Sequence, residues 1–526
     1  MRVAHSVAKV REAEEALMAR LPEGALMQRA AAGLAAVCAR LLRESGRVRG
    51  RVVVVLAGSG GNGGDALYAG ARLAGRGAEV HAVLTAPKRA HPGGLAALRA
   101  AGGRVAELGD VDGAAAAALL GRAELVLDGI VGIGGRGGLR DEVMPLVRVL
   151  RGVRRPLVVA VDVPSGVDAD TGAVVPETAA AGPDGEPAGL GARAVRADVT
   201  VTFGTGKPGL FVDPGAQHAG AVELVDIGLE PWLGAADLLI PQHADVARRL
   251  RGIAPRPESD KYRRGVVGIA AGSARYPGAA LLSVAGAARG GAGAVRYAGA
   301  AAREVVRAHP ETLVSDGLPG GAGRVQAWVV GPGLSRDEHA ARIVDDVLAL
   351  EAVLPKLFDA DALALVAERG PQVLRGRHPN ALLTPHAGEA ARLLGEGWSA
   401  ARVEAERIAA VRELAGRYGV AVLLKGSTTL LAAPGDGPVH VNPTGTGWLA
   451  TAGSGDVLAG LAGAQLAAGG SALGAGATAA YLHGLAGRRA AFGDGAVGAP
   501  ITAGDVAAAL PEVWRQVVSS GASDGV

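Results

Sequence analysis

The stretch 442–461, NPTGTGWLATAGSGDVLAGL, holds the residue types best suited to chemistry in this chain. Its GSGD turn, residues 453–456, falls where a loop gives way to the helical pattern of Val457, Leu458 and Leu461. The backbone N–H groups of the turn are therefore expected to be unpaired at a helix N-terminus, which is an anion site. The carboxylate of Asp456 could take a proton from a hydroxyl while the amides hold phosphate charge. The turn predicts a phosphate-handling site; the alternative is an ordinary helix cap.

Two further motifs in the second half favour the phosphate interpretation. KGSTT, residues 425–429, follows the apolar run 420–424, and TPHAGE occupies residues 384–389. Lys425 is expected to meet a phosphate or its loop, with a solvated lysine at a strand end as the alternative. His386 is expected to contact a substrate, and its alternative is a structural histidine bonded to Glu389 or to the backbone.

In the first half, three oxygen-bearing residues follow separate apolar runs. Asn62, Asp128 and Ser165 would suit a hard cation better than zinc if their loops converge, because they offer only oxygens. Asn62 and Ser165 are equally common as turn formers, so this spacing leaves both interpretations open. The surrounding loop 58–66, GSGGNGGDA, resembles a dinucleotide fingerprint but places its acid within the loop.

Composition limits the classes of function. The 526 residues are 49% hydrophobic and 20% charged, with a net charge of +3 and no basic block, so nucleic acid is not an expected partner. The single cysteine, Cys38, excludes an intramolecular disulfide. Neither a signal peptide nor an uninterrupted apolar span is recognisable, so we expect no membrane association and a cytoplasmic protein.

Two α/β series are predicted to position these residues. After the run RVVVVLA, the first series has strands at Glu79–Leu84, Ala123–Leu127, Pro156–Val161, Ala197–Phe203 and Ala221–Val225. The second has strands at Gly265–Ala270, Val295–Ala298, Ala327–Val330, Val353–Phe358, Ala381–Leu383 and Val420–Leu424, with a small-residue helix at Ala279–Gly290. Polar or glycine-rich loops end most strands, as in a doubly wound sheet with ligands at the strand C-termini. Residues 176–192 read as a flexible insertion and 228–260 as the domain join.

The first series resembles a known family. GSGGNGGD, LDGIVGIG, VDVPSGVD and ADVTVTFGTGKPGL, in this order, are similar to the NAD(P)H-hydrate epimerase family over residues 10–235. The resemblance implies a Rossmann-like fold, potassium bound by Asn62, Asp128 and Ser165, and Asp162 as acid/base residue. It also implies that hydrated nicotinamide nucleotide is contacted by Gly61, Asn62, Gly63, Gly64, Asp65, Gly132, Ile133, Gly134, Gly135, Arg136, Gly137, Gly138 and Asp162. Gly61 is a departure, since the family usually has asparagine there.

The second series resembles the ADP-dependent NAD(P)H-hydrate dehydratase family, which is ribokinase-like. The shared motifs lie within residues 240–517: KYRRGVVGIAAGSARYPGAALL, GPGL, DADAL, TPHAGE, LKGSTT and the GSGD stretch. The resemblance implies that the substrate is contacted by Ala279, Gly333, His386 and Asp456, with Asp456 as base. It implies an adenine nucleotide, with magnesium, at Lys425, Gly426, Ser427, Thr428, Thr429 and Gly455. Departures are GSGD for the frequent GTGD, and Asp260 for a common histidine.

These features together predict a fused repair enzyme, with an epimerase domain at 1–235 and a dehydratase domain at 236–526. The first would interconvert the R and S hydrates of NADH or NADPH, and the second would convert the S form to NAD(P)H while ADP becomes AMP and phosphate. A homo-oligomer acting on small molecules is expected. One alternative is a ribokinase-like small-molecule kinase fused to a nucleotide-binding module, and another is an N-terminal binding module without turnover. The residues do not separate ADP from ATP; ADP follows from the bacterial form of the family.

Overall fold

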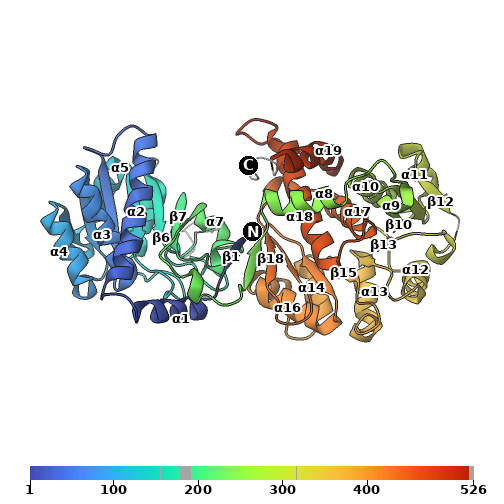
Figure 1. The fold of residues 1–526 in the computed structure, drawn as a ribbon, viewed down its shortest axis with the longest axis horizontal. Helices are drawn as coiled ribbons and strands as arrows, with labels where there is room; N and C mark the ends of the chain where they lie inside the picture. Colours follow the sequence, from blue (N-terminus) through green and yellow to red (C-terminus); the bar gives the residue numbers. More distant parts are fainter. Residues whose placement is uncertain (154–155, 178–190, 316, 521–526) are drawn as a thin grey trace, which may run out of the picture. The chain divides into compact units, whose positions relative to one another are not determined.

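The chain divides into two compact units (Figure 1). The computed structural model describes residues 1–153, 156–177, 191–315 and 317–520. One unit is Val3–Asp237, and the other joins Met1–Arg2 to the chain from Leu238 onward.

The N-terminal unit is built on a parallel sheet of seven strands in the order β4-β3-β2-β5-β6-β7-β8. The strands are β2 (Val52–Ala57), β3 (Glu79–Leu84), β4 (Arg104–Glu107), β5 (Leu125–Gly129), β6 (Leu157–Val161), β7 (Val199–Phe203) and β8 (Ala221–Val225). The helices are α1 (Val7–Met18), α2 (Ala25–Glu44), α3 (Gly61–Gly75), α4 (Pro92–Ala100), α5 (Gly113–Arg122), α6 (Met144–Gly152) and α7 (Ala216–Ala219).

Helices cover both faces of this sheet. Residues of α1, α2 and α3 share one buried cluster with the strands, and residues of α5 and α6 share another on the opposite face. The chain runs outward from β2 through β3 to β4 and then returns to β5, so the winding reverses between β2 and β5. This confirms the predicted Rossmann-like, doubly wound class, in which ligands bind at the point of reversal.

Three local features of this unit differ from the sequence-based expectation. The third strand continues through Gly129, so Asp128 lies within β5 and is fully buried instead of starting a loop. Asn62 and Asp65 lie on helix α3, which already begins at Gly61; its N-cap, Gly60, has a φ of 87°, a conformation that glycine adopts readily. The short outer strand β4 was not anticipated, since RVAE has too little apolar periodicity to signal a strand.

Among the described helices, α2 is the one long and apolar enough to cross a membrane by length and composition. Its residues Leu34, Ala35 and Cys38 are fully buried in the core of the N-terminal unit. A helix buried in the core of an α/β unit meets the same criterion of length and composition.

The second unit has an 11-stranded sheet in the order β1-β9-β18-β17-β16-β15-β14-β13-β10-β11-β12. The strands are β1 (Arg2–Ala4), β9 (Leu238–Ile240), β10 (Val266–Ala270), β11 (Ala294–Ala298), β12 (Leu313–Ser315), β13 (Ala327–Val330), β14 (Lys356–Phe358), β15 (Ala381–Leu383), β16 (Ala421–Leu424), β17 (Thr429–Ala432) and β18 (Val439–Asn442). The helices are α8 (His243–Gly252), α9 (Lys261–Arg264), α10 (Pro277–Arg289), α11 (Ala302–Ala308), α12 (Glu338–Ala349), α13 (Asp361–Arg369), α14 (Ala387–Leu394), α15 (Ala400–Ala405), α16 (Arg407–Tyr418), α17 (Ser454–Ala467), α18 (Ala472–Phe492) and α19 (Ala503–Ser520).

From β16 to β12 the neighbouring strands are parallel, and β17 and β18 add an antiparallel hairpin next to β16. Helix α17 is buried on all sides from Val457 to Ala467, which makes it a core helix. It packs most closely on α10: a Cβ at Gly460 would lie 1.9 Å from the carbonyl oxygen of Ser283, and one at Gly286 would lie 2.2 Å from that of Val457. Only glycine allows the two backbones to approach this closely, which accounts for the small-residue composition of both helices.

The segment 228–260 is more ordered than predicted, because its apolar run Leu238–Ile240 forms β9 beside β18 and residues 243–252 form α8. The proline-rich composition that suggested a simple join belongs to the turns around these elements. The predicted insertion, 176–192, lies outside the described residues except at its ends, where Pro176 and Ala192 form an antiparallel bridge.

Candidate functional sites

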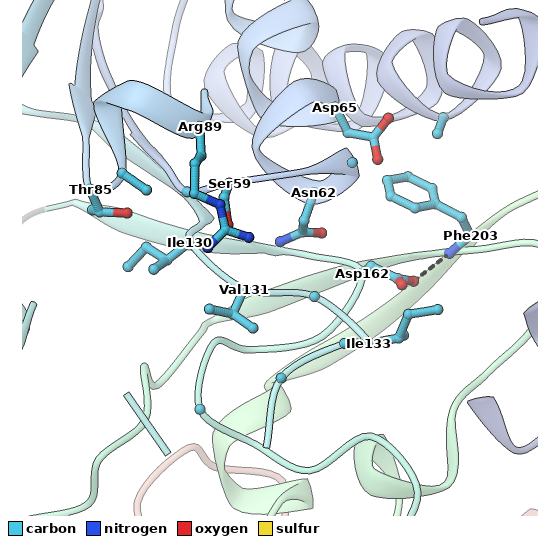
Figure 2. Close-up of a pocket in the computed structure, with 18 of the residues that line it drawn as sticks. Ser59, Asn62, Asp65, Thr85, Arg89, Ile130, Val131, Ile133, Asp162 and Phe203 are labelled. Carbon is cyan, nitrogen blue, oxygen red and sulfur yellow. Dashed lines mark hydrogen bonds between the residues drawn. The ribbon is translucent and has the colours of Figure 1, made fainter. Parts of the chain in front are cut away.

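The N-terminal unit contains a cavity of about 830 Å³ along the C-terminal ends of its strands (Figure 2). It extends from Thr85 and Arg89, after β3, across the N-terminus of α3 to Asp162 and Phe203. Ten of the predicted contact residues line it: Gly61, Asn62, Asp65, Gly132, Ile133, Gly134, Gly135, Arg136, Gly138 and Asp162.

Gly63, Gly64 and Gly137 do not line the cavity. A Cβ at Gly63 would lie 2.3 Å from the carbonyl oxygen of Gly58, so this glycine allows the tight turn from β2 into α3. Gly64 packs against the ring of His91, where a Cβ would approach to 3.0 Å. These two glycines shape the loop that other residues present to the cavity.

Asp162 follows β6 with a φ of 67°, a backbone conformation uncommon for a residue with a side chain. Its Oδ1 accepts hydrogen bonds from Nζ of Lys207 at 2.5 Å, from Oγ1 of Thr202 at 3.0 Å and from the amide of Phe203 at 3.2 Å. Lys207 is 1% exposed, and its ammonium also donates to the carbonyl oxygen of Phe203 at 2.9 Å. The carboxylate that faces the cavity is thus held rigidly by a buried cation.

Lys207 was not identified from the sequence. The available signal was a lysine in FGTGKPGL, directly after an apolar strand, where an unpaired charge would be costly to bury.

Asp65 presents a second acid to the cavity, on the same side as Asp162 (Figure 2). Its Oδ1 is buried and has no hydrogen-bond partner among the described residues. Burial, followed by repulsion from Asp162 and Glu14, raises the pKa of Asp65 well above its ordinary value. The pKa of Glu14, which also lines the cavity, is raised by burial as well. This end of the cavity therefore combines a lysine-paired carboxylate, Asp162, with two acids whose pKa values are raised.

The predicted potassium ligands lie close to one another. The amide of Ser165 donates to Oδ2 of Asp128 at 2.8 Å, and Oγ of Ser165 donates to Oδ1 at 2.6 Å. Burial raises the pKa of Asp128 to about 6, against the opposing effect of these hydrogen bonds. Asn62 lies against the segment that follows β5, since a Cβ at Gly132 would lie 2.8 Å from Oδ1 of Asn62.

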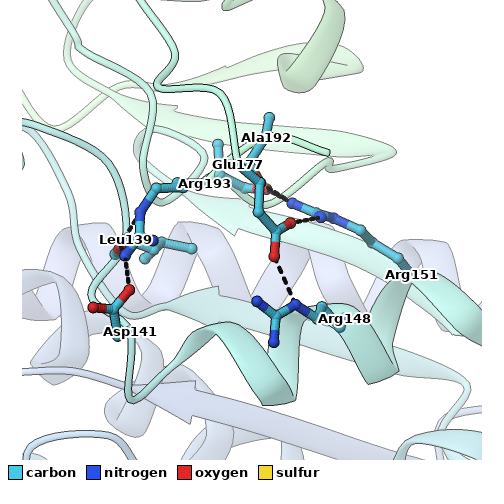
Figure 3. A network of polar contacts seen from close by, with 8 residues as sticks. Leu139, Asp141, Arg148, Arg151, Glu177, Ala192 and Arg193 are labelled. Atoms are coloured by element: carbon cyan, nitrogen blue, oxygen red, sulfur yellow. Dashed lines mark hydrogen bonds and ion pairs between the residues drawn. The ribbon is translucent and has the colours of Figure 1, made fainter. Parts of the chain in front are cut away.

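A polar network holds the end of the glycine loop 132–138 (Figure 3). Arg193 donates through Nε to the carbonyl oxygen of Leu139 at 2.9 Å and pairs with Asp141 at 2.7 Å. In the neighbouring part of the network, Glu177 accepts from Nε of Arg148 at 2.6 Å and from Arg151 at 3.0 Å. The loop is consequently attached at its C-terminal end to the segment that follows the insertion.

In the second unit, the GSGD turn is the N-terminus of α17, as predicted. Gly453 is the N-cap with a φ of 87°. The four amides of the turn are not all unpaired, because the N–H of Asp456 donates to the carbonyl oxygen of Gly453 at 3.1 Å and that of Ser454 to Thr451 at 3.4 Å. The first turn of the helix is tightened by these i→i+3 bonds. Of the four amides of the turn, those of Gly453 and Gly455 are the two without an acceptor among the described residues.

Lys425 occupies the centre of a group of carboxylates beside this turn. Its ammonium lies 2.7 Å from Oδ1 of Asp359 and 3.7 Å from Oε2 of Glu389. A Cβ at Gly455 would lie 3.7 Å from the same nitrogen, which places the cation next to the N-terminus of α17. Lys425 is therefore not the solvated lysine of the alternative interpretation: although burial lowers its pKa, Asp359, Glu389 and Asp456 together hold that pKa above the ordinary value.

Asp456 has the electrostatic properties of a base that works near neutral pH. Burial, followed by repulsion from Asp359, raises its pKa to about 7 against the attraction of Lys425. A carboxyl with such a pKa is ionised often enough to accept a proton and basic enough to hold it.

The KGSTT segment forms the connection between β16 and β17. Lys425, Gly426, Ser427 and Thr428 lie in the loop, whereas Thr429 is the first residue of β17 and is 9% exposed. Beneath the loop, the buried Arg407 of α16 donates to the carbonyl oxygens of Lys425 at 3.1 Å and Thr428 at 3.0 Å.

Two buried residues that support the second site were not predicted. Arg407 is one, and its position in the helical run RIAAVRELAGRY gave no functional signal. The other is His483 of α18, whose Nε2 lies 2.9 Å from the carbonyl oxygen of Ser454. Burial lowers the pKa of His483 to about 4, so it supports the α17 turn as a neutral hydrogen-bond donor.

His386 makes the contacts of its structural alternative. It is the N-cap of α14: Nδ1 accepts from the amide of Gly388 at 3.0 Å, and Nε2 lies 3.4 Å from Oε1 of Glu389. Its side chain nevertheless remains 60% exposed, so the ring edge is open to a ligand.

Ala279 and Gly333 lie next to each other, since a Cβ at Gly333 would lie 2.6 Å from that of Ala279. Ala279 is in the first turn of α10, and Gly453 touches Leu282 of the same helix. The close packing of α10 on α17 thus brings the Ala279 region to the same end of the unit as Asp456.

The comparisons with known proteins cover both halves of the chain. A family model described as NAD(P)H-hydrate dehydratase matches residues 267–506, and one described as YjeF-related protein N-terminus matches 23–209. The bifunctional NAD(P)H-hydrate repair enzyme of Mycobacterium tuberculosis is 45% identical over 474 residues, covering 89% of this chain and 90% of that protein. The enzyme of the same description in Corynebacterium glutamicum is 36% identical and covers 79% of this chain and 78% of that protein. The crystal structure of an ADP/ATP-dependent NAD(P)H-hydrate dehydratase from Bacillus subtilis, co-crystallised with ATP and Mg²⁺, is 29% identical with a TM-score of 0.46 and covers 52% of this chain and 97% of that one.

The fold and the sequence motifs together define a two-unit α/β protein in which a Rossmann-like half precedes a ribokinase-like half. The chain belongs to the family of bifunctional NAD(P)H-hydrate repair enzymes.

Proposed function

We propose that the two units catalyse consecutive steps in the repair of hydrated NADH and NADPH, with residues 1–235 as the epimerase domain and 236–526 as the dehydratase domain. The first interconverts the R and S hydrates, and the second converts the S form to NAD(P)H while ADP becomes AMP and phosphate. Family membership along both halves supports this assignment. The observation that carries it is Asp456, a carboxyl with a pKa of about 7 at the N-terminus of α17, beside the ammonium of Lys425.

Epimerisation inverts a carbon that carries both a hydroxyl and the ring nitrogen. One of these bonds opens and closes again on the other face, and each direction requires a proton to move. Asp162 moves that proton, and Lys207 keeps its carboxylate oriented. Gly61 and the glycines within the loop 132–138 let the nucleotide approach the backbone closely.

Dehydration requires a hydroxide to leave from the hydrated ring. Transfer of the β-phosphoryl group of ADP to the hydroxyl releases AMP and makes the hydroxyl a good leaving group. The lone pair of the ring nitrogen then expels phosphate to give an iminium ion, and the adjacent ring carbon loses a proton to the released phosphate, which restores the dihydropyridine. Asp456 takes the hydroxyl proton, while Lys425 and the Gly455 amide balance the negative charge of the transferring group. Residues 425–429 hold the nucleotide, and Ala279, Gly333 and His386 hold the hydrate.

A magnesium ion would arrive bound to the nucleotide phosphates, and the carboxylate of Asp359 offers the kind of oxygen that such a hard cation prefers. When bound, it would neutralise phosphate charge during the transfer.

Two variants of the full chain separate the activities. Asp456→Ala is expected to lose about 10³-fold or more of the ADP-dependent recovery of reduced cofactor, on the scale of removing a catalytic acid/base, while retaining epimerisation. Asp162→Asn is expected to show the reverse pattern. Absorbance of the dihydronicotinamide and chromatography of the two epimers measure the two reactions.

Each rival function makes a different prediction in the same assay. A kinase would accumulate a stable phosphorylated alcohol instead of reduced cofactor. An N-terminal binding module would leave epimerisation at the spontaneous rate in the unmodified protein, and continued fast epimerisation by the Asp162→Asn chain would exclude Asp162 as catalyst.

We further infer that Asn62, Asp128 and Ser165 bind potassium. All three side chains carry oxygen, and the buried Nδ2 of Asn62 has no hydrogen-bond partner among the described residues. Rotation of this amide by 180° would direct its oxygen to the same position, as a cation requires. When bound, the ion would place a positive charge beside the nucleotide site.

Thermal unfolding tests this potassium site independently of catalysis. KCl should raise the transition temperature of the N-terminal unit more than equimolar NaCl, because a ligand that binds only the folded state stabilises it. Ser165→Ala should abolish this difference. Equal responses of the unmodified protein to the two salts would contradict the assignment.

Location in the cytoplasm and assembly into a homo-oligomer are supported only by the resemblance to the family. Light scattering after size-exclusion chromatography measures the assembly state, and a monomer at assay concentrations would contradict the expectation.

A further inference from the structure

The epimerase cavity extends along the C-terminal ends of the strands, from the reacting centre after β6 to the end of β3. Asp162 marks one end, after β6, and Thr85 and Arg89 mark the other, after β3. Between these ends the cavity passes the N-terminus of α3 and the reversal point between β2 and β5. Its volume of about 830 Å³ is more than a nicotinamide ring alone would fill.

The order of Asp162, the N-terminus of α3 and the end of β3 along the cavity sets the orientation of the substrate. If the hydrated ring lies against Asp162, as proposed above, the pyrophosphate lies at the N-terminus of α3 and the adenosine half lies at the end of β3. In Rossmann-like folds this second strand end contacts the adenosine ribose: an acid there binds the 2′-hydroxyl, whereas an arginine accommodates a 2′-phosphate.

The end of β3 carries the residues that favour phosphate. The sequence from 85 to 91 is TAPKRAH, without an acid. Arg89 lines the cavity, and within the described parts of the chain its guanidinium has neither an ion pair nor a hydrogen bond. Figure 2 shows this side chain directed toward Ser59, on the opposite side of the cavity from Asp65.

Arginines line the cavity at more than one place: Arg11 accompanies Glu14, and Arg136 and Arg140 line it as well. The acids Glu14, Asp65 and Asp162 belong to the end where the ring reacts, whereas the lining at the end of β3 carries Arg89 and no acid. We propose that Arg89 binds the 2′-phosphate of the adenosine ribose, so that the epimerase site prefers hydrated NADPH to hydrated NADH. This inference rests on the proposed epimerase function.

Steady-state epimerisation without ADP tests the preference. Purified R hydrates of NADPH and NADH are given separately to the full-length protein, to Arg89→Gln and to Lys88→Gln. Lys88 is the matched control, because it is the adjacent exposed cation but does not line the cavity. A charge-assisted contact to phosphate predicts that kcat/KM of the unmodified protein favours hydrated NADPH by about 10- to 100-fold.

Arg89→Gln should bring this ratio close to one by raising KM for hydrated NADPH, with kcat and the values for hydrated NADH nearly unchanged. Lys88→Gln should keep the ratio of the unmodified protein, and Arg89→Lys should keep part of it, since a lysine supplies charge without the bidentate fork. Thermal unfolding of each variant verifies that the N-terminal unit is folded.

The proposal is overturned if the unmodified protein handles both hydrates equally, or if Arg89→Gln weakens both to the same extent; in either case the epimerase function stands. If the unmodified protein does not accelerate epimerisation at all while its dehydratase is active, the proposed epimerase function fails, and this inference fails with it.

Discussion

At the scale of single residues, each site depends on a carboxylate that is held by its charged neighbours. Asp162 lies 2.5 Å from the buried ammonium of Lys207, which fixes the position of its carboxylate. Asp456 is partly buried and repelled by Asp359, and its pKa rises to about 7. The same side chain is therefore held in two different environments: by a buried cation in the N-terminal unit and beside a second carboxylate in the other.

The pKa of Asp456 predicts the pH dependence of the dehydratase. A base acts in its ionised form, so kcat/KM should fall about tenfold for each pH unit below a midpoint near 7 and level off above it. Asp359→Asn removes the repulsion and should shift this midpoint to lower pH. Initial rates of NADPH recovery between pH 5 and about 9 measure both profiles, and a midpoint that Asp359→Asn leaves unchanged would contradict this origin of the pKa.

At the scale of elements, the nucleotide loop between β16 and β17 is positioned from below by a helix. Arg407 of α16 donates to two carbonyl oxygens of the loop, and a Cβ at Gly426 would lie 2.2 Å from its guanidinium. With the carbonyls held by the helix, the other side of the loop is available to the nucleotide.

Replacing Arg407 should therefore weaken nucleotide binding more than it slows chemistry. Arg407→Met is expected to raise KM for ADP by about tenfold or more, the loss of one to two charge-assisted hydrogen bonds, with partial recovery in Arg407→Lys. Arg412→Met on the same helix is the control, because Arg412 donates to Gly437, away from this loop. An unchanged KM for ADP in a folded Arg407→Met protein would exclude the positioning role.

At the scale of the whole molecule, one chain carries a site that interconverts the two epimers and a site that uses only the S epimer. The dehydratase alone would leave the R hydrate unused, so a neighbouring epimerase keeps the S form supplied. This arrangement does not by itself require the hydrate to pass directly between the two sites.

Mixing two inactivated chains distinguishes direct transfer from diffusion. Asp162→Asn should convert only the S half of an equal mixture of hydrates quickly, and Asp456→Ala should convert none. If the hydrate diffuses, an equimolar mixture of the two variants should reach complete conversion at a rate close to that of the unmodified protein at the same number of active sites. A mixture that stops at half conversion would show instead that both sites must be active in one chain.

The sequence by itself determined the elements and motifs that depend on nearby residues. The strands Glu79–Leu84 and Ala327–Val330 were predicted with their observed bounds, because apolar runs ending at turn residues are local signals. The start of α17 at the GSGD turn was predicted for the same reason, and the order of motifs identified the family.

Only the tertiary structure decided which charges meet. Lys207 reaches Asp162 across 45 residues and Lys425 reaches Asp359 across 66, because strand order in each sheet brings their loops together. Arg407 lies in an ordinary helical pattern, and its role appears only when α16 packs under the loop. Burial depth also belongs to the packed molecule, and burial together with repulsion from Asp359 separates Asp456, with its pKa of about 7, from a solvated aspartate.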